Sequence, residues 1–117
     1  MTSDILKNRT KKFAIDVLHH LETLPSKYPF IPIQHQLSRA SMSVGANYRA
    51  AVRAKSTADF INKLKIVEEE CDECLYFLEI LNEISPETKA KRVLLLIEAN
   101  EILAIMVASI KTTKSKR

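Results

Sequence analysis

The strongest constraint on the fold is a helical repeat of small and apolar residues between positions 33 and 51. These residues recur every three or four positions and fall within one narrow arc of a helical wheel: Ile33, Leu37, Ala40, Val44, Tyr48 and Ala51. The opposite side is largely polar and carries Arg39, Arg49 and Arg53. The segment is therefore predicted to form a helix with one buried face and a basic outer stripe.

Gly45 lies inside this predicted helix and is the only glycine in the chain. A glycine within a helix costs about 1 kcal/mol relative to alanine. Its presence indicates that another backbone approaches the helix at this point, and tolerated sequence drift is the alternative. Asn47 borders the core arc of the same helix. We expect it to hydrogen-bond a neighbouring helix, or to lie at the edge of the core in contact with water.

The boundaries of the first helix follow from a capping signal at its start and helix-breaking prolines after its end. Thr2 or Ser3 is suited to the N-cap of a first helix. The segment from Leu24 to Pro32 contains three prolines and cannot continue that helix. Three apolar side chains of this loop are expected to close one end of the fold: Tyr28, Phe30 and Ile31.

Two further signals start the second half of the chain. Ser56, with Asp59 three residues later, resembles a capping box. Ser85, Pro86 and Glu87 supply an N-cap, a proline at the first helical position and an acid in the first turn. The helices are expected at about residues 3–23, 33–55, 57–83 and 86–111, followed by a frayed basic tail at 112–117.

Four long helices with short connections are typical of an antiparallel bundle. The chain has 117 residues, of which one is glycine and four are proline, so most of it is available for helix. We therefore predict an all-α, up-down-up-down four-helix bundle that forms a single domain over residues 1–117. The longest apolar run is short for a membrane span and no signal peptide is apparent, so a cytoplasmic protein without a membrane partner is expected.

Two of the helices have more apolar surface than one core requires. The third and fourth carry a second apolar stripe away from the core arc, formed by Ile66, Phe77, Ile80, Leu94, Ile97 and Ile105. Soluble monomers seldom expose so much apolar surface, so these residues are predicted to form subunit interfaces of a homo-oligomer. Scattered surface hydrophobes are the alternative.

No catalytic or metal-binding constellation is found. Cys71 and Cys74 lie on the buried arc of the third helix, which favours core packing over a redox or zinc pair. The acidic run from Glu68 to Glu73 lacks inward histidine partners, and Glu70 and Glu73 are expected to pair with Arg49 or Arg53. We therefore predict a protein that is not an enzyme and has no metal and no cofactor.

Residues 43–60, SVGANYRAAVRAKSTADF, carry the most specific motif of the chain. With Arg39, Ala40, Ile61, Glu70 and Glu73, this motif resembles the family of 23S rRNA intervening-sequence proteins, small four-helix bundle proteins encoded in insertions within bacterial 23S rRNA genes. The resemblance runs from about Phe13 to Ile110 and implies a bundle that is often assembled as a homopentamer. The chain also resembles the accessory proteins of diversity-generating retroelements, which implies a reverse transcriptase and nucleic acid as partners.

Charge is unevenly distributed along the chain. Residues 1–55 have a balance of +6, residues 56–105 a balance of −6, and the last twelve a balance of +4. This segregation predicts a basic face that contacts phosphates of RNA or DNA with little sequence preference. Mutual neutralisation of solvated helix faces is the alternative. The candidate contacts are Lys7, Lys11, Lys12, Arg39, Arg49, Arg53, Lys55 and Lys114.

The predicted function is therefore that of a homo-oligomeric bundle that binds RNA or a nucleoprotein partner, such as a reverse transcriptase or a ribosomal component. An assembly or adaptor protein with no nucleic-acid role is the alternative. Burial of the basic face against Glu68 to Glu73 of a neighbouring subunit would favour the adaptor. Only 6% of the residues are aromatic, which argues against an aromatic platform for stacking bases.

Overall fold

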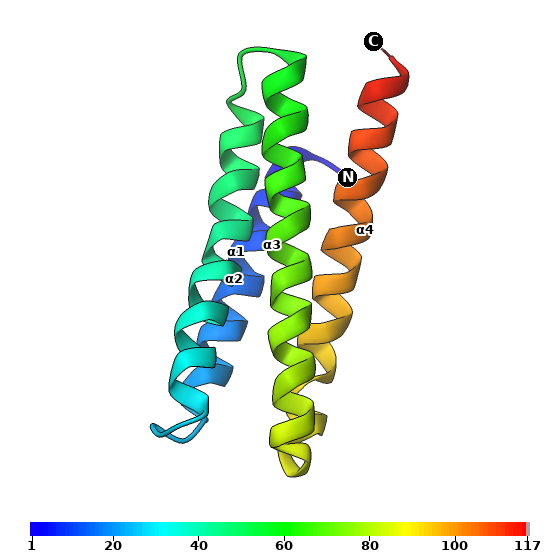
Figure 1. Cartoon of the computed structure of the whole chain (residues 1–117). Helices are drawn as coiled ribbons and strands as arrows, with labels where there is room; N and C mark the ends of the chain where they lie inside the picture. The colour runs from blue at the N-terminus through cyan, green and yellow to red at the C-terminus, as the bar shows by residue number, and fades with distance from the viewer. Residues whose placement is uncertain (117) are drawn as a thin grey trace.

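The apolar stripes predicted from the sequence meet in one all-α bundle. The computed structural model describes residues 1–116, and its long helices run up and down along a common direction (Figure 1). Four α-helices and one short 3₁₀-helix follow one another: α1 (Ser3–Glu22), α2 (Phe30–Val52), α3 (Thr57–Ile84), η1 (Pro86–Arg92) and α4 (Val93–Ser115). The predicted four-helix bundle is confirmed.

The core is formed by the predicted arcs of all four helices. Phe13 and Val17 of α1 pack with Leu37 and Val44 of α2, and each of these side chains is fully or almost fully buried. The arcs of α3 and α4 complete the core with Leu64, Val67, Cys71, Cys74, Leu78, Leu95, Ala99, Ile102 and Met106. Burial of these stripes is the main free-energy gain of folding.

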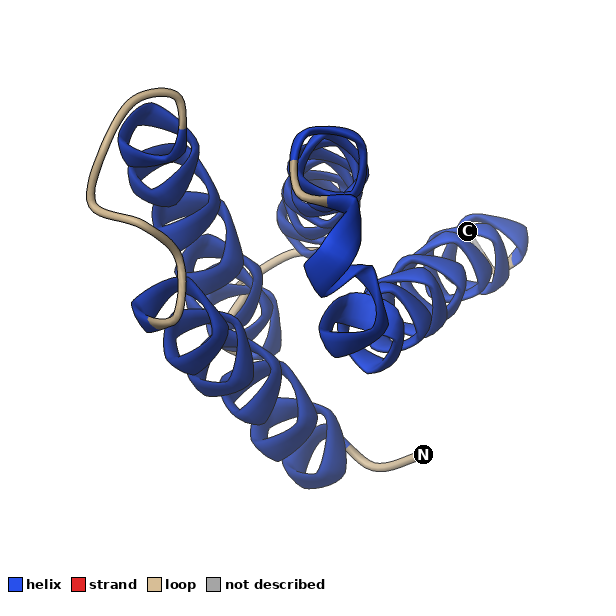
Figure 2. Ribbon diagram, turned by 90° about the horizontal axis from the view of Figure 1, so that it is seen from below, coloured by secondary structure: helices blue, strands red, loops and turns tan. Residues whose placement is uncertain are grey.

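The neighbouring helices follow the order of the chain. α2 packs against both α1 and α3, α3 packs against α4, and α1 and α4 make the sparsest contact of these pairs. The view along the bundle shows α3 between the α1–α2 pair and α4 (Figure 2). The molecule measures 48 × 20 × 19 Å, so each helix presents a long side to its surroundings.

The capping signals were correct for α1 and α3. Thr2 Oγ1 accepts from the backbone N–H of Ile5, and Ser56 Oγ accepts from that of Asp59. Each bond satisfies one of the N–H groups that a helix leaves without an internal partner.

The prediction for α2 was wrong at both ends. The helix begins at Phe30 and includes Pro32, because a residue in the first turn needs no N–H for the helix. It ends at Val52, and Arg53 is its C-cap. Of the side chains expected to close this end of the bundle, Phe30 is buried, whereas Tyr28 is 83% exposed.

The fourth helical segment begins at Pro86 as predicted, but its first part is not α-helical and its end lies beyond the predicted residue 111. Ser85 does not cap a backbone N–H with its side chain, and the segment Pro86–Arg92 forms a 3₁₀-helix before α4 begins. At the other end α4 continues to Ser115, so residues 112–115 of the predicted tail are helical. Arg117 lies outside the described residues.

The turn between α3 and α4 is organised around Arg92, whose side chain is completely buried. A guanidinium has five N–H donors, and each finds an acceptor here. No carboxylate lies within ion-pair distance of Arg92 among residues 1–116. Its acceptors are Asn82 Oδ1 (2.7 Å), Thr88 Oγ1 (2.9 Å), His20 Nε2 (3.3 Å) and the backbone oxygens of Leu81 (3.0 Å) and Ser85 (2.9 Å).

Asn47 does not hydrogen-bond a neighbouring helix. Its Nδ2 donates to the backbone oxygen of Ser43 at 3.0 Å and to Ser43 Oγ at 2.8 Å, both within α2. The expected role in fixing helix register is therefore not supported, because bonds between residues four apart form inside any single helix.

Candidate nucleic-acid interface

Two of the cations predicted to contact phosphates form ion pairs with carboxylates of the same chain. Lys12 Nζ lies 2.6 Å from Asp16 Oδ2, one turn along α1. Arg39 Nη2 of α2 lies 3.0 Å from Glu73 Oε1 of α3. Each of these cations already has an acidic neighbour, which lowers the positive potential that it presents to a ligand.

The predicted pairing of Arg49 or Arg53 with Glu70 or Glu73 was wrong, because Arg39 takes that place. Arg39 Nη1 also lies 3.8 Å from Glu70 Oε2. Burial raises the pKa of Glu70, as does the nearby Glu73, while Arg39 acts in the opposite direction. This pairing leaves Arg49 available for another role.

Lys7, Lys11 and Arg49 flank a shallow groove between α1 and α2. Lys7 and Lys11 stand one helical turn apart on α1, and Arg49 stands on α2. None of the three has a carboxylate within ion-pair distance in the described part of the chain. The groove is a hollow of about 200 Å³, and its other lining residues are Thr10, Ala14, Met42, Gly45 and Ala46.

The floor of the groove is formed where Gly45 meets Thr10. A Cβ added at Gly45 would lie 3.3 Å from Thr10 Oγ1 and 3.5 Å from the Thr10 backbone carbon. The predicted close backbone approach is confirmed, and α1 is the partner. Thr10 is fixed in place, because its hydroxyl donates to the backbone oxygen of Leu6 at 2.9 Å.

The remaining predicted contacts lie elsewhere on the surface. Arg53 is the exposed C-cap of α2, and Lys55 belongs to the connection between α2 and α3. Lys114 lines a separate hollow between α3 and α4, beside Lys65 and Lys111. The structure therefore brings three of the eight predicted cations together in one groove, and does not gather the others there.

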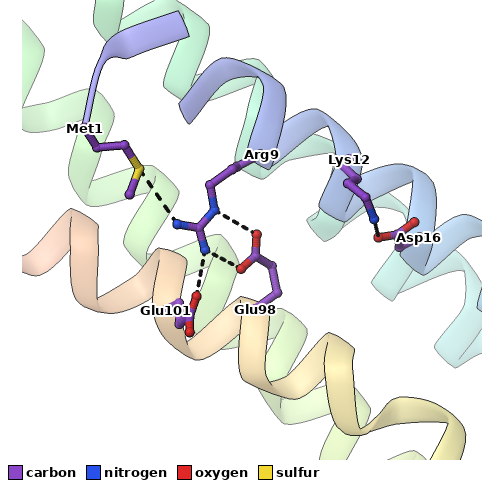
Figure 3. A network of polar contacts seen from close by, with 6 residues as sticks. All are labelled: Met1, Arg9, Lys12, Asp16, Glu98 and Glu101. Atoms are coloured by element: carbon purple, nitrogen blue, oxygen red, sulfur yellow. Dashed lines mark hydrogen bonds and ion pairs between the residues drawn. The ribbon is translucent and has the colours of Figure 1, made fainter. Parts of the chain in front are cut away.

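Arg9 was absent from the predicted site, and it joins α1 to α4. Its Nε donates to Glu98 Oε2 at 3.0 Å, and its Nη2 contacts both Glu98 Oε1 and Glu101 Oε2 (Figure 3). The hydrogen bond to Glu98 is the main cause of the raised pKa of Arg9. This ion-pair cluster bridges two helices that contact each other less than each contacts its neighbour in the chain.

The groove residues Thr10, Ala14, Met42 and Ala46 were also not predicted. One signal could have found them: Lys7 and Lys11 bracket Thr10 on α1, and Gly45 marks the place where α2 is approached. Small residues at such a crossing leave a hollow between the helices, with the longer basic side chains around it.

Cys71 and Cys74 are free, fully buried thiols within the core. Burial is the main cause that raises the pKa of Cys71 to about 12 and that of Cys74 further still. The predicted core role is confirmed, and both thiols are protonated at neutral pH.

The predicted oligomer residues divide into two groups. Leu94 and Ile97 are 77% and 49% exposed on α4. Ile66 and Ile80 are half-buried, and Phe77 and Ile105 are half-buried against the core of the same chain. The uncovered apolar surface is therefore centred on α4, where Val93 and Val107 are exposed as well.

The stretch Pro86–Ser115 is long and apolar enough, by composition alone, to cross a membrane. This is weak evidence for a membrane span, since core helices of soluble proteins pass the same test. Such core helices are mostly buried, whereas only 28% of the most apolar part of this stretch is buried within the chain, in agreement with the exposure of Leu94 and Ile97.

Comparison with known proteins agrees with this architecture. The family model of the 23S rRNA-intervening sequence protein matches residues 4–108. The crystal structure of a protein of unknown function from the S23 ribosomal protein family of Bacteroides thetaiotaomicron superimposes with a TM-score of 0.86 at 31% identity, covering 95% of this chain and 99% of that one. No curated protein matches the sequence.

Neither description names an enzymatic activity. The family match spans nearly the whole bundle, including both helices of the groove. The chain therefore belongs to the family of 23S rRNA-intervening sequence proteins.

Proposed function

We propose that this protein is a homo-oligomeric RNA-binding bundle without enzymatic activity, and that it contacts phosphates through the groove between α1 and α2. The observation that carries the proposal is the difference between neighbouring cations. Lys12 and Arg39 have carboxylate partners, whereas Lys7, Lys11 and Arg49 flank a common groove with no such partner among residues 1–116. Unpaired cations that converge on one place are available to replace the counterions of a phosphate backbone.

Self-assembly supports this function by presenting several grooves to one RNA. The exposed apolar side chains of α4, led by Leu94 and Ile97, supply a surface that a second copy would cover. One weak basic groove per subunit would then be multiplied by avidity. A pentamer, as the resemblance implies, would present five such grooves.

The family descriptions make RNA the first ligand to test, although they name no ligand. The family is named for the intervening sequence of 23S rRNA, and the structural relative is assigned to a ribosomal protein family. Since nothing in the groove resembles a base-reading helix, binding is expected to depend strongly on salt and weakly on sequence. A reverse transcriptase or a ribosomal component would present the same phosphates through the nucleic acid bound to it.

An adaptor that binds only protein is the second candidate. It is favoured by the acidic side chains of α3 that line a hollow with Leu103 and Val107, namely Glu68, Glu69 and Asp72. Such a surface could receive the basic groove of a neighbouring subunit. In that case Lys7, Lys11 and Arg49 would be buried in the oligomer and would not reach RNA.

Fluorescence anisotropy with a labelled RNA strand at low salt distinguishes the RNA-binding bundle from the protein adaptor. The variant Lys7→Gln/Lys11→Gln/Arg49→Gln should bind RNA at least about tenfold more weakly, because it loses three phosphate contacts while keeping good helix formers. Lys12→Gln is the matched control and should bind like the wild type. If the triple variant keeps its oligomeric mass and binds RNA as the wild type does, the adaptor is the better account.

A further inference from the structure

We propose that the groove between α1 and α2 holds an unpaired nucleobase as well as phosphates, so that the protein selects single-stranded over duplex RNA. This inference rests on the proposed function and goes beyond it. Phosphate binding alone requires only exposed cations. The groove also has an interior, and that interior is largely apolar.

The shape of the groove suits a small planar group. Its volume of about 200 Å³ lies below the range of pockets that take drug-sized ligands, which begins at about 300 Å³. Thr10, Ala14, Gly45 and Ala46 keep the floor low, since none of them has a long side chain. A flat ring can therefore lie over Gly45 and Ala46, where α2 crosses α1, between the basic rims.

The side chain of Met42 is the second observation. It lies on the side of α2 away from the core, where it is 49% exposed, and it lines the groove. A thioether is polarisable and adapts to aromatic rings of different shape. Arg49 lines the same groove, and a guanidinium plane can stack on a base. Met42 and Arg49 can thus hold a base without an aromatic side chain.

The charges around the groove complete the fit to a nucleotide. Lys7 and Lys11 stand on one rim, and Arg49 stands on α2 across from them. A base seated between them would place the two phosphates of its own backbone within reach of the rims. In duplex RNA the bases are stacked and paired inside the helix, so a base could enter only after being flipped out.

The test compares three probes of about 12 nucleotides: a single RNA strand, the same strand without bases, and the duplex. The wild type should bind the single strand about tenfold more tightly than the abasic strand and more tightly than the duplex, because a held base adds to the phosphate contacts. Ala46→Leu fills the groove without changing a charge, and Met42→Gln removes the thioether. Both should reduce binding of the single strand to the abasic level.

Ala58→Leu is the matched control, since Ala58 is exposed at the start of α3 and away from the groove. It should leave all three affinities unchanged. If the abasic strand binds as tightly as the base-bearing strand and both depend on Lys7, Lys11 and Arg49, the proposed function stands and base binding is wrong. If no probe binds at low salt, both proposals fail.

Discussion

Arg92 Nη1 and His20 Nε2 lie 3.3 Å apart and join the turn before α4 to the end of α1. Since a guanidinium can only donate hydrogen bonds, Nε2 of His20 must be the acceptor and its ring must be neutral. Protonation would replace the acceptor with a second donor and place two cations together in a buried site. Burial is the main cause that lowers the pKa of His20, followed by the charges of Arg92 and Lys91.

The first prediction is that this contact makes stability depend on pH. His20 in the folded protein binds protons less readily than in the unfolded chain, where its pKa is about 6.5. Its contribution to the free energy of unfolding is therefore complete above pH 6.5, and it is lost as the pH falls from there through the lowered pKa of the folded state. Urea unfolding between about pH 8 and pH 5 measures this loss.

His20→Gln isolates the contribution of His20 from that of the carboxylates, because glutamine can accept from Arg92 but does not titrate. The difference in unfolding free energy between the wild type and this variant should shrink as the pH falls. His19→Gln is the control, since His19 is exposed on the neighbouring position of α1. Parallel pH profiles for the wild type and His20→Gln would show that His20 is not linked to folding.

The burial of Arg92 and His20 could have been suspected from the sequence. Arg92 is three residues before Leu95 and seven before Ala99, and His20 is three residues after Val17 and four before Leu24. Both polar residues therefore fall on the apolar arcs of their helices. The other acceptors of Arg92 could not have been predicted, because they lie in a 3₁₀-helix and a chain reversal that helical periodicity does not describe.

The second prediction concerns the crossing of α1 and α2. Gly45→Ala should gain about 1 kcal/mol of helix propensity, but its methyl group would press on Thr10 Oγ1 at 3.3 Å, so the net gain should be close to zero. With Thr10→Ala in the background, the obstructing oxygen is absent and Gly45→Ala should stabilise by about 0.5–1 kcal/mol. Thermal or urea unfolding of the four proteins gives the coupling. Additive effects would mean that the contact does not constrain Gly45.

The ion pair of Arg39 depends on how α2 and α3 are aligned along each other, which the helical periodicity of each helix alone does not give. Arg39 lies fourteen residues before Arg53, and Glu70 lies fourteen residues after Ser56. In an antiparallel hairpin, residues at equal distances from the connection lie side by side, so Arg39 faces Glu70. Arg49 and Arg53 are too close to the connection to reach that turn of α3. Helical spacing alone was enough to predict the core arcs, whereas predicting this ion pair also required the position of the turn between α2 and α3.

The third prediction is that α4 mediates self-association. Leu94→Glu/Ile97→Lys places charges at positions exposed in the single chain, so its fold should be retained. In an interface these charges would be desolvated at a cost of several kcal/mol, and the oligomer should dissociate. Light scattering gives the mass and circular dichroism gives the helix content. A wild-type mass equal to one chain at micromolar concentration would contradict homo-oligomerisation.

The salt dependence of RNA binding tests the central claim most directly, and two adjacent lysines provide the comparison. Lys11 lines the groove without an acidic partner among the described residues, whereas Lys12 pairs with Asp16 at 2.6 Å. If Lys11 contacts a phosphate, Lys11→Gln should lower the slope of log affinity against log salt concentration by about 0.7 for a single strand, and Lys12→Gln should leave it unchanged. Equal slopes for the wild type and Lys11→Gln, or a larger loss in Lys12→Gln, would contradict RNA binding through this groove.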